Sequence, residues 1–421
     1  MQVKSKYIPK LEDVKRAANT LNGIVIETPL NLNLRYSKQY QSQVYFKRED
    51  LQQVRSYKIR GAYNKMSSLS AEQAKNGIVC ASAGNHAQGV AIACKKLKIK
   101  GHIFMPSPTP HQKIEQVKMF GEEYIDIKLI GDSYDDAYEA ANNHCKEKRQ
   151  TFIHPFNDPK VIEGQATIAL EILNQIESRQ IDYVFLPVGG GGLASGLSEM
   201  FKLLSPKTKV IGVEPKGAPS MSKAIKKDDN ISLSQIENFV DGAAVKRVGN
   251  LTFSIAKDNL HDMITVDEGH ICQTILDLYN KEAIIAEPAA ALSIAALEHY
   301  ADQIKDKTVV CIISGSNNDI TRTAEIKERA MLYADLKHYF IVKFPQRAGA
   351  LRQFVVEILG PDDDITYFQY TKKTNRENGA AVVGIELKSK SDFKPLVERM
   401  KINNFYGDYL NNKPDLFQFL V

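Results

Sequence analysis

The sequence of 421 residues contains no apolar run long enough to span a membrane, and its polar N-terminus has no apolar segment of the secretion-signal kind. Cysteines are few, and the five that occur form no CxxC pair and leave an odd one. A disulfide framework and a structural zinc site are therefore both disfavoured. We expect a protein that is neither exported nor anchored and that works in the reducing cytoplasm. The cysteines are Cys80, Cys94, Cys145, Cys272 and Cys311.

The sequence also lacks blocks of like charge, tandem repeats and low-complexity tracts. Its 55 basic and 50 acidic residues are interspersed and leave a net charge of +5, so nothing marks a surface for nucleic acid. Hydrophobic residues make up 43% and charged residues 25%, the balance of a soluble globular protein. A chain of this length exceeds one ordinary core, and we expect two or three domains.

Continuous apolar runs alternate with amphipathic stretches through most of the first 325 residues. This pattern predicts buried strands alternating with helices, and so an α/β fold with a largely parallel sheet. Such sheets bind ligands at the C-terminal ends of their strands, which makes the residues after each run candidates for a site. The apolar runs are 44–48, 77–82, 102–106, 182–188, 209–215 and 308–314.

The rhythm changes after a charged helical stretch at 325–337, which we interpret as a connector. The remaining residues predict the order β, α, β, β, α, β, with the last strand at 416–421, which is typical of a ferredoxin-like α+β domain. We therefore expect a catalytic region at 1–330, with a smaller subdomain of about 45–150 inserted in the larger one, and a separate small domain at 331–421.

Lys58 lies between an aromatic and an aliphatic residue in the segment SYKIRGA, near the start of a predicted helix. Burial lowers the pKa of a lysine, so a partly buried lysine is a competent amine for Schiff-base formation at neutral pH. Taken alone the segment decides little, because most lysines are solvated surface residues.

The segment SAGNHAQG follows an apolar run and precedes a predicted helix. Small residues at Ser82 and Gly84 let backbone N–H groups approach an anion at the helix N-terminus, and Asn85 offers a side-chain amide to a ring hydroxyl or phenolate. We expect this loop to hold a carboxylate. The alternative is an ordinary N-capped helix with His86 in its first turn.

Four consecutive glycines, Gly189, Gly190, Gly191 and Gly192, precede Leu193 where an apolar run meets a predicted helix. Their bare amides are suited to cradle a phosphate at the positive end of that helix. A turn that needs glycines only for packing is the alternative.

The same run also fits the dinucleotide fingerprint G-x-G-x-x-A, because Ala194 follows Gly191 at the right spacing, and Glu214 ends the next strand near where a ribose-binding acid belongs. An NAD-dependent oxidoreductase is therefore a rival hypothesis, although it leaves the other motifs without a role. A further motif, SGSNN, begins with Ser314 at the end of an apolar run. A serine there would be a neutral partner for a heterocyclic nitrogen, whereas alone the motif is an ordinary Gly-rich turn.

Taken together and in this order, these motifs resemble the fold-type II pyridoxal-phosphate enzymes, and most closely the biosynthetic threonine dehydratases. The resemblance continues through TPL (28–30), KREDLQ (47–52), HPF (154–156) and EPAAA (287–291). It implies an α/β fold of the tryptophan synthase β type with two α/β subdomains, and pyridoxal 5′-phosphate as the cofactor.

The resemblance also implies a role for each motif. Lys58 forms the Schiff base with the cofactor, Asn85 contacts its 3′-oxygen, and Ser314 contacts its pyridine nitrogen. Gly189–Leu193 hold the phosphate. The residues implied to hold the substrate carboxylate are Ser82, Gly84 and Asn85.

The implied reaction is the dehydration and deamination of L-threonine to 2-oxobutanoate and ammonia, the committed step of isoleucine biosynthesis, with L-serine as a further substrate. Lys58, once freed, removes the Cα proton as general base. Serine racemases resemble the chain too, but they carry a second serine where Ala83 stands, so we expect no racemisation. A non-catalytic amino-acid sensor on the same fold is a third hypothesis, against which the intact Lys58 argues.

Two departures from the related sequences bear on ligands. Racemases bind a divalent ion through an acid-rich segment; Glu214 and Ala218 match it, but Ser220 replaces its aspartate, and we expect no metal. The family's HPFDDP motif reads HPFNDP in this sequence, with Asn157 where the family has an aspartate. The contribution of that acid is therefore absent or is made by Asp158.

The tail from about His338 resembles the ACT-like regulatory domain of the same family through FPQRAGAL (344–351). The resemblance implies isoleucine as a feedback effector that shifts the population of catalytic states. The turn would present backbone N–H groups at Ala348 and Gly349 to an amino-acid carboxylate, with Arg347 adding charge. A module that merely dimerises the chain is the alternative. We expect a homo-oligomer, either a dimer or a tetramer.

Overall fold

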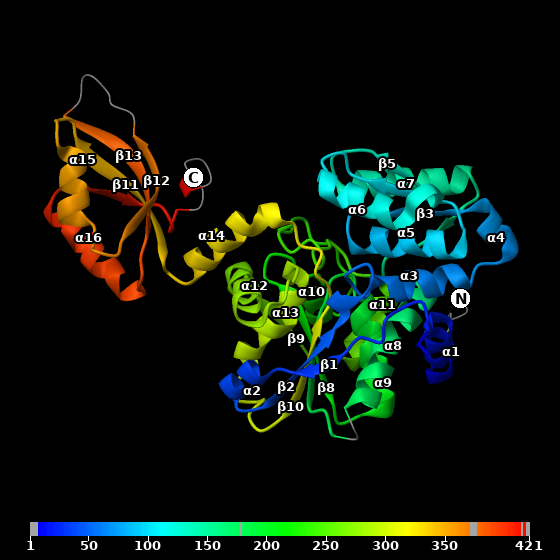
Figure 1. Cartoon of the computed structure of the whole chain (residues 1–421). Coiled ribbons are helices and arrows are strands. Elements are labelled where there is room, and N and C mark those ends of the chain that lie inside the picture. The colour runs from blue at the N-terminus through cyan, green and yellow to red at the C-terminus, as the bar shows by residue number, and fades with distance from the viewer. Residues whose placement is uncertain (1–6, 177–178, 371–376, 414–415, 418–421) are drawn as a thin grey trace. The chain divides into compact units, whose positions relative to one another are not determined.

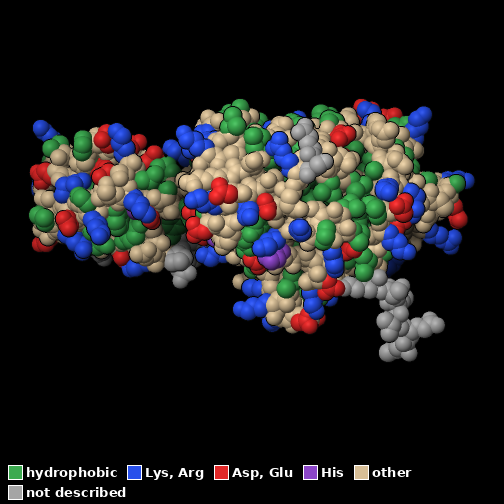
Figure 2. All heavy atoms as spheres, turned by 90° about the horizontal axis from the view of Figure 1, so that it is seen from below, with side chains coloured by type: hydrophobic (Ala, Val, Ile, Leu, Met, Phe, Trp, Pro, Cys, Tyr) green, Lys and Arg blue, Asp and Glu red, His purple; other side chains and the backbone are tan. Residues whose placement is uncertain are grey.

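The computed structural model describes residues 7–176, 179–370, 377–413 and 416–417. The chain divides into two compact units, Met1–Arg322 and Thr323–Val421 (Figure 1). Within the described ranges, no helix combines the length and the apolar character needed to cross a membrane. Lys and Arg side chains lie next to Asp and Glu side chains on the face in Figure 2, as the interspersed charges of the sequence predict.

The larger sheet of the first unit has the strand order β1-β2-β10-β7-β8-β9, in which only the edge strand β1 is antiparallel to its neighbour. Its apolar residues pack against helices on both faces, which explains why the central strands have continuous apolar runs. The strands are β1 (Leu30–Leu32), β2 (Gln43–Arg48), β7 (Tyr183–Pro187), β8 (Lys209–Pro215), β9 (Asp262–Val266) and β10 (Thr308–Ile313).

The smaller sheet of the first unit has the order β5-β4-β3-β6 and is parallel throughout. Successive residues of β3 point to opposite faces: Ile78 and Cys80 join one apolar cluster, and Val79 and Ala81 join another. All six apolar runs of the sequence thus form strands, which confirms the predicted α/β class. The strands of this sheet are β3 (Ile78–Ala81), β4 (Gly101–Met105), β5 (Ile125–Leu129) and β6 (Thr151–Phe152).

Helices connect these strands and cover both sheets (Figure 1). The helices of the first unit are α1 (Leu11–Leu21), α2 (Leu34–Tyr40), α3 (Lys58–Ser67), α4 (Ala71–Asn76), α5 (Asn85–Leu97), α6 (His111–Gly121), α7 (Tyr134–Glu147), α8 (Pro159–Gln175), α9 (Gly192–Leu204), α10 (Ser220–Lys227), α11 (Asn250–Asn259), α12 (Glu268–Glu282) and α13 (Pro288–Ala295).

The start of helix α3 is held closely by its two neighbours. A Cβ atom at Gly89 of α5 would lie 3.0 Å from the carbonyl carbon of Lys58, and a Cβ atom at Gly164 of α8 would lie 2.5 Å from the carbonyl oxygen of Arg60. A side chain at Gly164 would collide with this backbone, and one at Gly89 would have to displace it by a few tenths of an ångström. The first turn of α3, which carries Lys58, is therefore fixed from two sides.

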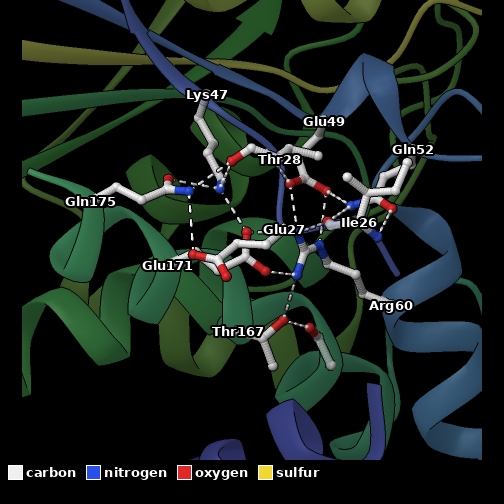
Figure 3. A network of polar contacts seen from close by, with 11 residues as sticks. Ile26, Glu27, Thr28, Lys47, Glu49, Gln52, Arg60, Thr167, Glu171 and Gln175 are labelled. Atoms are coloured by element: carbon white, nitrogen blue, oxygen red, sulfur yellow. Dashed lines mark hydrogen bonds and ion pairs between the residues drawn. The ribbon is translucent and has the colours of Figure 1, made fainter. Parts of the chain in front are cut away.

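A buried polar cluster also ties α3 to β2 and α8 (Figure 3). The guanidinium group of Arg60, which is 0% exposed, donates to both oxygens of Glu49 at 2.8 Å each and also binds Glu171. The ammonium group of Lys47 donates to Glu171 at 2.6 Å, and the hydroxyl of Thr28 donates to Glu49 at 2.6 Å. Two cations are thus balanced by two anions, of which Glu49 is fully buried and Glu171 is partly exposed, and this pairing is the condition for keeping buried groups charged.

The second unit begins with helix α14 (Thr323–Tyr333) and contains a four-stranded antiparallel sheet of order β12-β13-β11-β14. Two helical segments follow β11 and β13, which gives the predicted ferredoxin-like β, α, β, β, α, β order. Phe340, Phe354 and Phe405 are fully buried in its core. The elements are β11 (Lys337–Pro345), α15 (Ala350–Gln353), the π-helical turn η5 (Phe354–Ile358), β12 (Asp364–Tyr370), β13 (Asn378–Glu386), α16 (Phe393–Ile402) and β14 (Tyr406–Tyr409).

The position of the last strand was predicted wrongly. The strand β14 is Tyr406–Tyr409, which pairs with β11, and not the apolar segment 416–421. Residues 416–417 are helical, and 418–421 lie outside the described residues. Pairing with β11 between the buried residues Phe405 and Leu410 makes a strand of a polar sequence, so tertiary contacts override its weak strand propensity.

Candidate active site

The lysine and serine motifs meet in space although more than 250 residues separate them. Ser56 and Gly315 form an isolated antiparallel bridge. The amide of Tyr57 donates to the carbonyl oxygen of Ser314 at 3.2 Å, and the amide of Ser316 donates to the carbonyl oxygen of Arg55 at 2.9 Å. Ser314 is 2% exposed and directly follows β10. The backbone therefore places Lys58 beside the C-terminal end of a central strand, where sheets of this kind bind ligands.

Lys58 is the first residue of α3 and is half-buried. Its ammonium nitrogen donates to the carbonyl oxygen of Pro155 at 3.2 Å and lies 5.3 Å from the ring centroid of Tyr57. Burial lowers the pKa of Lys58 to about 8, although the nearby carboxylate of Glu287 acts in the opposite direction. A useful fraction of the amine is therefore unprotonated near neutral pH, as nucleophilic and base chemistry requires.

The SAGN loop follows β3 and leads into α5, which begins at Asn85 and has no side-chain cap. The amide of Gly84 donates to the hydroxyl of Ser82 at 3.2 Å, and a Cβ atom at Gly84 would meet open space. His86 is buried: its Nε2 lies 2.9 Å from the carbonyl oxygen of Ile153, and burial lowers its pKa to about 3. His86 is thus a neutral packing residue, and an ordinary capped helix does not account for Asn85.

The side chain of Asn85 is held by two residues from distant parts of the chain. Its amide nitrogen donates to both carboxyl oxygens of Glu287, at 2.8 and 2.9 Å, and its oxygen accepts from the amide of Asn317 at 2.6 Å. Glu287 is 5% exposed, and burial raises its pKa to about 7. The sequence analysis gave no role to Glu287 or Asn317, although they lie in the segments EPAAA and SGSNN. The only signal was an acid directly before a proline at a helix start, and many structural helices share that signal.

The glycine run joins β7 to α9, and Gly191 has the left-handed φ of 91° that glycine favours. A Cβ atom at Gly190 would lie 2.2 Å from the ring of Phe156, and one at Gly191 would lie 2.7 Å from Met221. Packing, the alternative left open by the sequence, therefore accounts for part of the run. The amides of the first turn of α9 have no partners inside the helix and remain suited to an anion.

Arg347, Ala348 and Gly349 belong to the second unit, at the turn between β11 and α15. The guanidinium group of Arg347 donates to Gln353 at 2.5 Å, and Gly349 has a left-handed φ of 84°. The first unit holds the other predicted site residues. The structure thus separates the two predicted sites, one in each unit.

Comparison with known proteins decides the family. Residues 21–315 match the family described as pyridoxal-phosphate dependent enzyme, and residues 328–420 match the C-terminal regulatory domain of threonine dehydratase. The chain is 53% identical over 419 residues to the L-threonine dehydratase biosynthetic IlvA of Bacillus subtilis, covering 100% of this chain and 99% of that protein. The chain belongs to the biosynthetic threonine dehydratase family.

Solved structures agree with this membership of the threonine dehydratase family. The processed form of threonine deaminase isoform 2 from Solanum lycopersicum is 37% identical with a TM-score of 0.72, covering 79% of this chain and 92% of that chain. Maize serine racemase is 28% identical with a TM-score of 0.71, covering 78% of this chain and 99% of that chain. The predicted fold type and pyridoxal phosphate dependence are confirmed.

Family membership removes the dehydrogenase hypothesis, and the geometry of Glu214 agrees. This residue is 0% exposed, and its carboxylate accepts from the amides of Met221 and Ser222 at 2.6 and 2.9 Å, which fixes the start of α10. Its carboxylate is already engaged in protein hydrogen bonds and is closed off from a ribose. Across the described ranges, no group of three or more His, Cys, Asp or Glu side chains is arranged to hold a metal ion.

The HPFNDP departure from the family also has a structural explanation. The side-chain oxygen of Asn157 accepts from the amide of Leu251 at 2.9 Å, a role that an aspartate or an asparagine fulfils equally. Asp158 caps α8 by accepting from Lys160 at 2.8 Å, and it pairs with Lys65 at 2.8 Å. The acceptor at position 157 is therefore retained in this member of the threonine dehydratase family.

Proposed function

We propose that the chain catalyses the dehydration and deamination of L-threonine to 2-oxobutanoate and ammonia, with pyridoxal phosphate bound at Lys58. Full-length similarity to threonine dehydratases supports this reaction. The observation that carries the proposal is the position of Lys58 next to the backbone of Ser314. Burial also lowers the pKa of Lys58, as the chemistry requires. The proposal includes L-serine as a further substrate, a cytoplasmic location and a homo-oligomer of two or four chains.

The residues present fit the cofactor. Lys58 would bind it covalently, and the first-turn amides of Gly189–Leu193 would hold its phosphate at the positive end of α9. Asn85, with its oxygen engaged by Asn317, has its amide nitrogen directed to acceptors and would meet the 3′-oxygen. Ser314 would offer a neutral hydroxyl to the ring nitrogen. When bound, pyridoxal phosphate supplies an electron-withdrawing ring that acidifies the Cα–H bond of the substrate.

The protein's own part in the reaction follows from these positions. The loop at Ser82, Gly84 and Asn85 would hold the substrate carboxylate at the N-terminus of α5, where the helix dipole favours an anion. Lys58 would take the proton from Cα, a step suited to an amine whose pKa is about 8. Departure of the β-hydroxyl as water leaves an enamine, which hydrolyses to the oxo acid and ammonia. A neutral Ser314 at the ring nitrogen would leave the ring a weaker electron sink, which favours prompt loss of the β-hydroxyl.

Racemisation is expected to be negligible, because Ala83 has no hydroxyl to move a proton on the second face of Cα. Incubation with L-serine should give pyruvate, with D-serine formed at less than about one hundredth of that rate, since a positioned acid–base group contributes about 10²–10⁴-fold. Chiral chromatography of the reaction measures both products. The variant Ala83→Ser is the test of cause, because it should raise D-serine formation. D-serine forming as fast as pyruvate in the unaltered enzyme contradicts the proposal.

We also propose that the second unit binds isoleucine at Arg347, Ala348 and Gly349 and lowers activity. A threonine titration with isoleucine should show a raised apparent threonine requirement, by about 5–150-fold for a typical coupling. The chain ending at Arg322 should be active and insensitive to isoleucine. Arg347→Ala should weaken inhibition, whereas the exposed Arg352→Ala serves as control and should not. If the truncated chain is inhibited as strongly as the full chain, the effector acts at the active site instead.

A further inference from the structure

The side-chain amide of Asn85 donates to the carboxyl group of Glu287 and still has one hydrogen for a second acceptor. The two oxygens of Glu287 lie at nearly equal distances from the amide nitrogen, 2.8 and 2.9 Å. The oxygens of one carboxylate are too close together to receive two divergent N–H bonds, so a single hydrogen serves both. The second hydrogen of the Asn85 amide has no acceptor among the described residues.

The orientation of the Asn85 amide is fixed by its other neighbour. The amide nitrogen of Asn317 donates to Asn85 at 2.6 Å, and it also donates to Gln88 at 2.8 Å and to the carbonyl oxygen of Val54 at 3.0 Å. A flipped Asn85 would place a donor against a donor and an acceptor against an acceptor. Asn85 therefore keeps one N–H on Glu287 and presents the other to a ligand.

Glu287 is held in place by backbone contacts. Its amide donates to the carbonyl oxygen of Gly315 at 3.1 Å, and a Cβ atom at Gly315 would lie 2.6 Å from its Oε1. The carboxyl group thus lies against the turn that follows Ser314, which is part of the proposed cofactor site. Glycine at 315 is what leaves room for it.

The charges around Glu287 come from several elements. Lys58 and Tyr57 lie at the start of α3, Lys113 lies on α6, and Asp241 lies in the segment before α11. Lys58 and Lys113 favour the ionised carboxyl group, whereas Asp241 and burial oppose it, and burial is the largest effect. In the described part of the chain, Lys113 pairs with Asp241 at 2.5 Å and no cation pairs directly with Glu287. The carboxyl group can therefore change its protonation near neutral pH.

We propose that Glu287 is a positioning residue for the cofactor: it orients Asn85 toward the 3′-oxygen of pyridoxal phosphate and takes up a proton when that oxygen binds. This inference rests on the proposed role of Asn85. An anionic oxygen on the second N–H would face an anionic carboxylate across the same nitrogen, and like charges at one site favour protonation of one of them. A protonated Glu287 still accepts from Asn85 through its carbonyl oxygen, so the orientation is kept.

The test uses the full chain freed of cofactor and titrated with pyridoxal phosphate at pH 7. Calorimetry in two buffers of different ionisation enthalpy measures proton uptake, and the wild type should take up about half a proton more than Glu287→Gln, because a carboxyl group with a pKa near 7 is half ionised there. Glu214→Gln is the matched control: Glu214 is also buried, its pKa is also raised to about 7, and its hydrogen bonds go to Met221 and Ser222 rather than to Asn85. It should behave as the wild type. Equal uptake by wild type and Glu287→Gln overturns the proposal.

A second measurement detects the protonated carboxyl group in the wild type directly, whatever the protonation state of Lys58. Infrared difference spectra of the wild type should show the carbonyl band of a protonated carboxylic acid on addition of pyridoxal phosphate, and Asn85→Ala should abolish that band.

The pH dependence of cofactor binding gives a further check. Above pH 7, the affinity of the wild type for pyridoxal phosphate should fall by about tenfold per pH unit relative to that of Glu287→Gln. No new carboxylic acid band overturns the proposal. If Lys58→Ala keeps the lysine-bound chromophore and turns over within tenfold of the wild type, the proposed function fails instead, and that result is separate from both measurements on Glu287.

Discussion

Ammonia release from L-threonine should be lost when Lys58 is replaced by alanine. We expect a fall of at least about 10⁴-fold, because base catalysis alone contributes about 10²–10⁴-fold and the covalent attachment of the cofactor disappears as well. The visible absorbance of the lysine-bound cofactor should vanish. Coupled assay of 2-oxobutanoate and an absorption spectrum of the purified protein provide the measurement.

The matched control for this variant is Lys65→Ala, on the same helix α3 but paired with Asp158. It should keep the chromophore and most of the activity. If Lys58→Ala retains the chromophore and turns over within tenfold of the wild type, the cofactor is attached elsewhere and the assignment of Lys58 is wrong.

Stability should fall sharply when Arg60 is replaced by methionine. Methionine keeps an apolar stem but has no guanidinium group, so Glu49, which is 0% exposed, loses its bidentate partner and is left as a buried charge. Removing one partner of a buried ion pair destabilises a protein by about 3–5 kcal/mol. Chemical unfolding of the cofactor-free protein measures the loss.

The control for Arg60 is Arg16→Met, which removes an exposed arginine that pairs with Asp13 on the surface of α1. Surface pairs of this kind contribute about 0–1 kcal/mol. A further variant, Glu49→Gln combined with Arg60→Met, should recover part of the loss because the buried charge is removed. A loss for Arg60→Met no larger than that for Arg16→Met contradicts the role given to the buried cluster.

The parts of the site that the sequence predicted are those with a local signature. Lys58, Asn85, the glycine run and Ser314 each lie in a short segment next to a buried strand or at a helix start, and the parallel sheets bring such segments to their C-terminal ends. The continuous apolar runs identified the central strands for the same reason, because both faces of those strands are covered.

The parts that the sequence did not predict depend on distant contacts. The contact between Asn85 and Glu287 spans 202 positions, and nothing local distinguishes EPAAA from an ordinary helix start. The edge strands β5 and β9 were not predicted, because they are only partly buried and have no continuous apolar run. The strand β14 has a polar sequence, so an apolar segment further along was chosen instead.

The bridge between Ser56 and Gly315 has a consequence for how the enzyme is made. Strand β2 pairs with β10, and Tyr57 is bonded to Ser314, so Lys58, the proposed cofactor lysine, obtains its final surroundings only from residues synthesised more than 250 positions later. A nascent chain still on the ribosome therefore has its lysine motif long before it has a site. Such non-local pairing forms late, because the intervening loop must close first. We therefore expect cofactor binding to begin only after β10 and the turn that follows it have been synthesised and have paired with the lysine segment.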